Sequence, residues 1–298
     1  MAIPESQLEM WSRQGSITQS KNTYATIKSA LEDSDSSYYG KSFEVFLQGS
    51  YGNDTNIFGE SDVDVVIRLD SIMTSDLSKL PEEQKNAYHK AYGKATYTFS
   101  EFKQKVINQL VDSFGKIDVV AGNKAVKIKA SGSRRNADIV ICYQYRRYIS
   151  FIDTEEQEYV PGIIFPTTTS GEIINYPKKH SENCTTNHQA TGSMFKPMVR
   201  ILKKMRSQMV EEGMLRDGAA PSYYLEGLFY NVPAEQYVAS SYGDTFCNGV
   251  NWLLKADRKK LVCANWQYWL LGNSNVQWNE ADFDSFLSAV CKLWKEWK

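Results

Sequence analysis

Two aspartates, Asp62 and Asp64, stand at alternate positions at the start of a β-branched run that ends at Leu69. Such a run is typical of a strand, in which residues i and i+2 point to the same face. The two carboxylates therefore project side by side, and the pKa of one rises unless a cation lies between them. Because Mg²⁺ binds one or two carboxylates together with substrate phosphates, the pair predicts a metal site for a phosphorylated substrate.

A glycine and a serine, Gly49 and Ser50, precede this pair and follow a predicted strand over residues 43–48. A glycine lets backbone N–H groups come close to a phosphate, and a small hydroxyl adds one more donor. A phosphate-binding turn followed by a metal-binding pair suits a nucleoside triphosphate.

A third carboxylate, Asp138, begins another apolar run that ends at Cys142, where an unpaired charge is costly. Three carboxylates can hold two metal ions about 4 Å apart, one that activates an attacking hydroxyl and one at the leaving phosphate. An isolated Asp-x-Asp is usually a solvated strand face, and an isolated Gly-Ser is usually a turn. The ordered combination of all these residues indicates a catalytic site.

The elements that must position these residues form an α+β half and then a helical half, joined within residues 160–190. We expect a loop over 49–61 and an irregular segment over 161–188. The expected strands are 43–48, 62–69, 117–120, 125–130 and 137–142. The expected helices are two pieces within 4–32, one over 80–114, and then 194–212, 222–232, 238–256 and 282–297.

The 298 residues are 42% hydrophobic, which is enough for one large domain or two modest ones. Lys and Arg number 34 and Asp and Glu number 35, so the chain lacks the basic excess of a binder of long nucleic acids. The five cysteines form no CxxC pair, and we find neither a signal peptide nor an apolar run of membrane-spanning length. We expect a reduced, cytoplasmic protein that does not enter a membrane.

The order Gly-Ser, Asp-x-Asp and a distant Asp resembles the DNA polymerase β-like nucleotidyltransferase superfamily. Within it, the chain resembles the cGAS/DncV-like nucleotidyltransferases, or CD-NTases, of bacterial CBASS anti-phage signalling. The narrower resemblance is carried by residues 47–51 (LQGSY), 61–65 (SDVDV), 199–205 (VRILKKM), 221–226 (PSYYLE) and 230–233 (YNVP).

This resemblance implies an α+β, bilobed fold. A polymerase β-like core of mixed sheet and helices, with an N-terminal spine helix, is expected over residues 1–175. A helical, oligoadenylate-synthase-like lobe is expected over 176–298. The implied activity joins ribonucleoside triphosphates (ATP, UTP, GTP or CTP) into a cyclic oligonucleotide, with a cyclic dinucleotide as the expected form. Two Mg²⁺ or Mn²⁺ ions assist, pyrophosphate leaves, and the product acts on a downstream effector protein.

The resemblance also implies individual roles. The implied catalytic and metal-binding residues are Asp62, Asp64 and Asp138. The implied nucleotide-binding residues are Gln48, Gly49, Ser50, Tyr51, Lys203 and Ser222. Lys204 is an alternative to Lys203, which could instead lie on a solvated helix face. Ser222 could be a helix N-cap after Pro221.

Base selection is expected to involve residues 173–179, where Tyr176 could stack on a base, as could Tyr51, and Asn175 could read a base edge. Loop packing is an equal alternative for each. Three lysines, Lys124, Lys127 and Lys129, form either a basic edge or, as we favour, a solvated edge strand.

His180, Cys184 and His188 are spaced four apart and could hold zinc, but a structural zinc site takes four ligands, so we expect none there. Three other functions compete with cyclic-nucleotide synthesis. They are template-independent RNA-terminal nucleotidyl transfer, nucleotide binding without catalysis, and modification of a small molecule.

Overall fold

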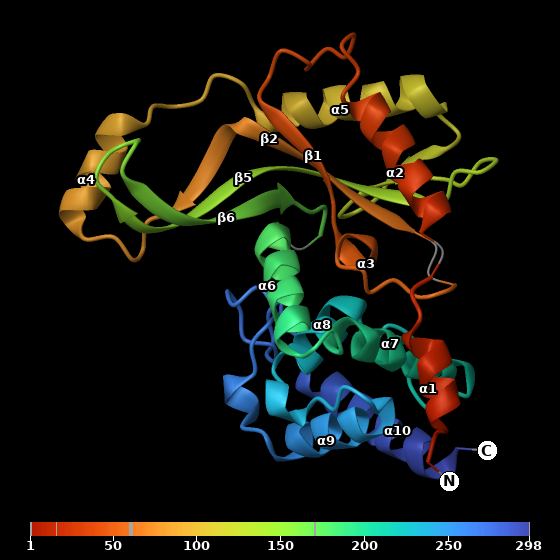
Figure 1. The fold of residues 1–298 in the computed structure, drawn as a ribbon. Coiled ribbons are helices and arrows are strands. Elements are labelled where there is room, and N and C mark those ends of the chain that lie inside the picture. The colour runs from red at the N-terminus through yellow and green to blue at the C-terminus, as the bar shows by residue number, and fades with distance from the viewer. Residues whose placement is uncertain (1, 16, 60–61, 170, 298) are drawn as a thin grey trace. The chain divides into compact units, whose positions relative to one another are not determined.

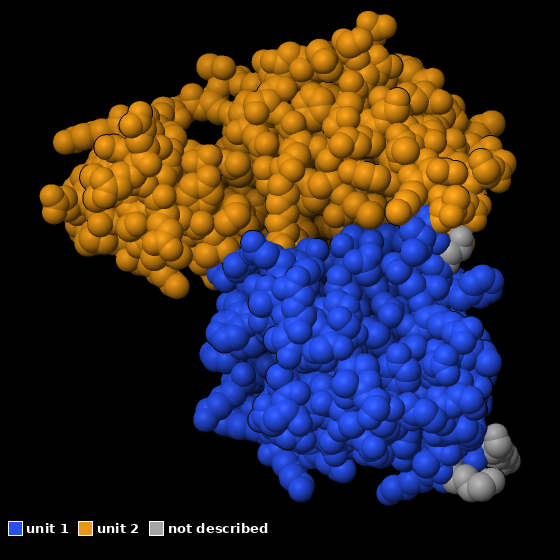
Figure 2. Space-filling model, viewed as in Figure 1, with its two compact units in different colours: residues 1–17, 49–60, 179–298 blue, residues 18–48, 61–178 orange. Residues whose placement is uncertain are grey.

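The structure, a computed structural model, describes residues 2–15, 17–59, 62–169 and 171–297. Its contacts group the chain into two compact units (Figure 2). The first, here called the sheet unit, comprises residues 18–48 and 61–178, and the second, the helical unit, comprises 1–17, 49–60 and 179–298. The predicted domains, 1–175 and 176–298, stay a prediction, but the segment that follows Gln48 clearly belongs with the helical unit by its contacts.

Within the described residues, the sheet unit contains a mixed sheet in the order β1-β2-β5-β4-β3, extended by β6 on β5 and by β7 on β6. Strands β2 and β5 pair in parallel, and the other pairs are antiparallel. The strands are β1 (Phe43–Leu47), β2 (Val63–Asp76), β3 (Val119–Ala121), β4 (Val126–Ile128), β5 (Ala137–Phe151), β6 (Gln157–Pro166) and β7 (Glu172–Asn175).

Helices α2 (Thr18–Leu31) and α5 (Phe99–Phe114) pack on one face of this sheet (Figure 1). Alternate residues of β2, including Val65 and Ile67, are fully buried. The long helix expected over 80–114 is wrong, because α4 (Glu82–Ala91) ends before residue 92. Helix α5 begins anew after Thr98, whose side chain forms a capping box with Glu101.

The helical unit is built around α7 (Phe195–Glu211), whose apolar stripe of Val199, Leu202 and Met205, expected on one side of the helix from its periodicity, is buried. The remaining helices of this part are α1 (Glu5–Ser12), α3 (Gly49–Gly52), α6 (Pro177–Ala190), α8 (Ser222–Tyr230), α9 (Tyr242–Lys255) and α10 (Glu280–Glu296), with 3-10 turns at Ala234–Gln236 and Arg258–Lys260.

Two sequence-based expectations are corrected here. Most of the described residues in 161–188 are not irregular, because they form the end of β6, then β7, then most of α6. Residues 49–61 are not wholly a loop, because α3 makes one helical turn directly after the glycine. The α+β class and the two N-terminal helical pieces, α1 and α2, are confirmed. Among the described helices, none is long and apolar enough to cross a membrane.

Burial in the sheet core predicts that the same Ile→Ala change lowers the unfolding free energy far more at a buried position than at an exposed one. Ile67→Ala removes a side chain that is 0% exposed, and the unfolding free energy should fall by about 2–5 kcal/mol. Ile117→Ala is the matched control, because Ile117 is 82% exposed and its truncation should change stability by less than about 0.5 kcal/mol. Urea denaturation measures both, and equal losses would contradict the packing described here.

Candidate active site

The sheet register brings the predicted catalytic carboxylates onto one row. Asp64 pairs with Asp138 across the parallel strands β2 and β5, and Lys127 of β4 pairs with Asp138 from the other side. Directly paired residues share a face of the sheet. Asp62 comes just before β2, and its ion pair with Lys127 brings it to the same row. The structure thus gathers Asp62, Asp64, Asp138 and Lys127 at one place on the sheet.

Electrostatics at this row follow from the crowding of carboxylates. Burial raises the pKa of Asp138, the charge of Lys127 lowers it, and the charge of Asp62 raises it again, with a net upward shift. Lys127 Nζ lies 3.1 Å from Asp62 Oδ2, and this hydrogen bond, with the charges of Asp62 and Asp138, raises the pKa of Lys127. The row therefore attracts a cation.

Lys127 is a site residue that the sequence interpretation missed. We assigned it to a solvated edge strand, but β4 lies between β3 and β5 and is not an edge. Within β4 its neighbours Val126 and Ile128 are buried while Lys127 is exposed on the carboxylate face. Only the pairing with Asp138 reveals its place, since β4 is three residues long and carries little pattern.

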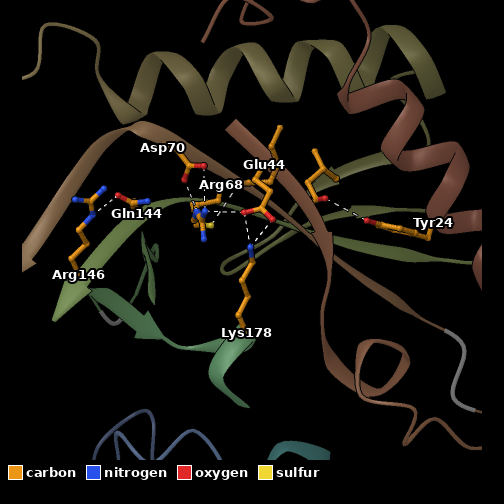
Figure 3. A network of polar contacts seen from close by, with 10 residues as sticks. Tyr24, Glu44, Arg68, Asp70, Gln144, Arg146 and Lys178 are labelled. Atoms are coloured by element: carbon orange, nitrogen blue, oxygen red, sulfur yellow. Dashed lines mark hydrogen bonds and ion pairs between the residues drawn. The ribbon is translucent and has the colours of Figure 1, made fainter. Parts of the chain in front are cut away.

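A network of ion pairs continues along the same face of β2 (Figure 3). Arg68 lies four residues beyond Asp64 and is 8% exposed. Its guanidinium contacts Glu44 Oε2 at 2.8 Å and Asp70 Oδ1 at 2.5 Å. Lys178 Nζ reaches Glu44 Oε1 at 2.5 Å, so the last residue of the sheet unit is tied to β1. These pairings neutralise Arg68 and fix the chain just beyond β7.

Part of the segment proposed for base selection, residues 173–179, packs inside the sheet unit. Tyr176 is fully buried, with its ring against Tyr145 and beneath the guanidinium of Arg147. The expectation that it stacks on a base is therefore wrong for this arrangement. Asn175 Oδ1 accepts a hydrogen bond from the N–H of Tyr176 at 2.8 Å, and its proposed reading of a base stays a prediction.

In the helical unit, residues 49–59 form what we call the Gly-Ser loop. Gly49 has a φ of +65°, a left-handed conformation that favours glycine. One helical turn follows, because the N–H of Asn53 donates to Gly49 O at 3.0 Å and the N–H of Thr55 donates to Ser50 O at 2.9 Å. Tyr51 in this turn is half-buried, and its nucleotide contact stays a prediction. Ser61, which begins the SDVDV stretch, lies outside the described residues.

A lysine of α7, Lys203, contacts the Gly-Ser loop directly. Lys203 is 0% exposed, and its Nζ donates to Ser50 Oγ at 2.7 Å and to Thr55 O at 3.0 Å. The alternative of a solvated helix face is therefore wrong for Lys203. Lys204 is half-buried and donates instead to Phe58 O at 2.5 Å. Of the two neighbouring lysines, Lys203 is the one that accompanies Ser50.

Other basic side chains of α7 contact the same loop one and two turns earlier. Lys196 Nζ lies 3.0 Å from Asp54 Oδ2, and Arg200 Nη1 donates to Asp54 O at 2.6 Å. Asp54 has a φ of +56°, which aspartate tolerates better than most residues do. The basic residues that interrupt the apolar stripe of α7 thus hold the backbone of the Gly-Ser loop.

Ser222 is the first residue of α8, after Pro221 at the N-cap position, so its interpretation as the N-cap is wrong. Its hydroxyl accepts a hydrogen bond from Arg206 Nη1 at 3.1 Å, and the same Nη1 donates to Ala220 O at 3.0 Å. Its contact with substrate phosphate stays a prediction.

A buried acid, Glu226 of α8, is a second residue that the sequence interpretation missed. Its Oε2 lies 2.5 Å from His180 Nε2 and accepts from Asn53 Nδ2 at 3.0 Å, while its Oε1 accepts from the Thr55 hydroxyl. No local pattern could reveal this, because His180 and Glu226 are 46 positions apart. Only the fold brings them together.

The structure does not bring together the three candidate metal ligands that the spacing suggested, which were His180, Cys184 and His188. In the described part of the chain, the metal-ligand types whose donor atoms all lie within 4.8 Å of one another are His180, Cys184 and Glu226. His188 is not in this group, and its Nδ1 faces the N–H of Lys196 at 3.4 Å.

Comparisons with known proteins cover both units of the chain. The family model of the cGAS/DncV-like nucleotidyltransferase C-terminal helical domain matches residues 182–295. The cyclic nucleotide synthase CdnE01 of Staphylococcus haemolyticus is 38% identical over 302 residues, which cover 100% of both chains. This chain belongs to the cGAS/DncV-like nucleotidyltransferases. The cyclic UMP-AMP synthase of Rhodothermus marinus is 40% identical over 298 residues, which cover 100% of this CD-NTase and 99% of that protein.

Solved structures agree with this assignment. The structure of Rhodothermus marinus CdnE c-UMP-AMP synthase with Apcpp and Upnpp matches with a TM-score of 0.88 and 38% identity, over 99% of this CD-NTase and 97% of that chain. The Elizabethkingia meningoseptica CdnE cyclic dinucleotide synthase with GTP and Apcpp matches with a TM-score of 0.76 and 28% identity, over 97% and 98%. The predicted family and enzyme class, a nucleotidyltransferase of the cyclic-nucleotide-synthase group, are confirmed.

The buried pair of His180 and Glu226 predicts how the stability of the fold depends on pH. Burial by itself lowers the pKa of His180, but contacts with Cys184 and Glu226 raise it from 6.5 to about 10. Burial also raises the pKa of the Cys184 thiol, so the carboxylate of Glu226 is the anion that keeps His180 protonated. Because the pKa of His180 is higher in the folded state, its stabilising contribution is complete below pH 6.5 and fades as pH rises towards 10.

We therefore expect the difference in unfolding free energy between the wild type and His180→Gln to shrink between about pH 6.5 and about pH 9.5, by at least about 1 kcal/mol. Urea denaturation of both proteins at each pH measures this difference. A difference that stays constant across the range would mean that His180 is not held protonated by Glu226.

Proposed function

We propose that this CD-NTase joins ribonucleoside triphosphates into a cyclic dinucleotide and releases pyrophosphate. The observation that carries the proposal is the row of Asp64 and Asp138, directly paired across β2 and β5, with Asp62 joined to it through Lys127. The names of the relatives above support cyclic dinucleotides as the product class. Since the Rhodothermus marinus relative is named a cyclic UMP-AMP synthase and its structure holds Apcpp and Upnpp, we propose ATP and UTP as substrates.

In this proposal the carboxylate row binds two Mg²⁺ or Mn²⁺ ions. Its chemistry fits, because carboxylate oxygens are the ligands these ions prefer, and the ion pair of Lys127 with Asp62 shows that the row attracts positive charge. Asp62, Asp64 and Asp138 would hold one ion, and Asp62 and Asp64 the other. When bound, such ions lower the pKa of an attacking ribose hydroxyl and neutralise the leaving phosphates.

The protein's own part on the phosphate side falls to the Gly-Ser loop and α7. The Ser50 hydroxyl and the Lys203 ammonium, 2.7 Å apart, would bind the triphosphate, with Ser222 as a further hydroxyl. Lys203 is fully buried, so bulk salt screens its charge little. Catalysis by this arrangement is positioning together with stabilisation of charge. We further propose that the product activates an effector protein in anti-phage defence, as the CD-NTase resemblance implies.

Mass spectrometry of the products from the four ribonucleoside triphosphates, with Mg²⁺ or Mn²⁺, tests this function. We expect a phosphatase-resistant cyclic dinucleotide that contains uridine and adenosine. Asp64→Asn should abolish it without lowering the melting temperature, and Asp112→Asn, an exposed change on α5, should leave it intact. Normal turnover by Asp64→Asn would overturn the assignment. Extension of an added RNA primer would favour the RNA-terminal nucleotidyltransferase.

Neighbouring lysines supply a second test. Lys203→Met removes the ammonium beside Ser50 and should raise the KM for triphosphate by about tenfold or more, as expected for a lost charge-assisted hydrogen bond. Lys204→Met should change the KM by less than about threefold, because Lys204 donates to Phe58 O instead. Steady-state kinetics of pyrophosphate release measures both, and equal effects of the two variants would contradict the role of Lys203.

A further inference from the structure

A buried carboxylate in the helical unit, that of Glu226, accepts hydrogen bonds from two residues of the Gly-Ser loop. Glu226 is 2% exposed, and burying a carboxylate is costly unless donors and a counter-charge satisfy it. Its donors are Asn53 and Thr55, both from the loop, and its partner is His180 of α6. The ring of Tyr223 stacks on His180 with centroids 4.9 Å apart and fixes the imidazole plane.

Charge around Ser50 depends on this carboxylate. Burial would raise the pKa of Glu226, but the hydrogen bond and charge of His180, followed by the charge of Lys203, lower it. Glu226 is thus the counter-charge for two buried cations, His180 and Lys203. With Glu226 ionised and both cations protonated, the cluster keeps one net positive charge. That charge lies where Lys203 meets Ser50, and it suits a polyphosphate anion.

We propose that Glu226 and His180 are positioning residues that hold Asn53 and Thr55, and through them the Ser50–Lys203 contact, in the geometry that binds a triphosphate. The proposal rests on the function proposed above for its choice of ligand. Neither residue needs to touch the substrate. They act through the loop, whose residue Thr55 both donates to Glu226 and accepts from Lys203.

A metal ion held by His180, Cys184 and Glu226 is the competing explanation of the same cluster. The atoms His180 Nε2 and Glu226 Oε2 are 2.5 Å apart, which is a direct hydrogen-bond distance. An ion bound to both at about 2.0–2.2 Å would need them about 3 Å apart or more. The geometry therefore favours the hydrogen-bonded pair.

The test is titration calorimetry of the full chain with inorganic tripolyphosphate in the presence of Mg²⁺. Glu226→Gln keeps the shape but loses the counter-charge, and we expect its dissociation constant to rise about tenfold. Thr245→Val is the control, because Thr245 is fully buried and its hydroxyl bonds with the backbone N–H and C=O of Val238, away from the Gly-Ser loop. The control should lose stability and bind tripolyphosphate as the wild type does.

Two variants that disturb the structure less keep the test decisive if Glu226→Gln does not fold. Thr55→Val removes only the hydroxyl that reaches Glu226 and should weaken tripolyphosphate binding several-fold, whereas Thr55→Ser should restore it to within about twofold. Unchanged binding in Thr55→Val or Glu226→Gln, with only a lower melting temperature, would overturn the proposal. So would stoichiometric zinc in the purified wild type whose removal abolishes binding.

The binding readout separates this inference from the proposed function. A wild type that binds tripolyphosphate, is weakened by Glu226→Gln, and yet makes no cyclic product would support the positioning pair and refute cyclic-nucleotide synthesis. Normal binding by Glu226→Gln, with product lost in Asp64→Asn, would refute the positioning pair alone.

Discussion

The contact on which the candidate site most depends is the buried ammonium of Lys203 against the Ser50 hydroxyl and the Thr55 carbonyl. A fully buried cation is tolerated only where acceptors and a counter-charge surround it. That requirement explains why the loop, α7 and the carboxylate of Glu226 form one continuous network. It also explains why residues 49–60 belong by their contacts to the helical unit, although both flanking segments belong to the sheet unit.

The carboxylate row and the Gly-Ser loop are therefore held in place by different interactions. In the sheet unit, strand register alone places Asp64 beside Asp138, since a shift of one residue would turn every side chain to the other face. In the helical unit, long basic side chains reach across to a loop whose backbone offers carbonyl acceptors. A sheet row is held by backbone pairing, whereas the segment around Ser50 and Thr55 depends on side-chain contacts from Lys203 and Glu226.

Patterns with a short period were readable from the sequence, and long-range pairings were not. Asp62 and Asp64 share a face because strands repeat every two residues, and the buried stripe of α7 follows from helical periodicity. Lys127 was misassigned because its partner Asp138 is set by register. Glu226 was missed because its partners lie in α6 and in the Gly-Ser loop, far away in the chain. Residues 161–188 were misread because β6 and β7 are stabilised by pairing with β5 and with each other rather than by local pattern.

Amide hydrogen exchange of the nucleotide-free protein tests most directly whether α7 and Glu226 hold the Gly-Ser loop in place. The N–H groups of Asn53 and Thr55 donate to Gly49 O and Ser50 O within the loop, so the account predicts protection approaching that of the buried turns of α7. Glu226→Gln should remove that protection while α7 keeps its own. Exchange of these two amides at the rate of an unstructured chain in the wild type would contradict the account.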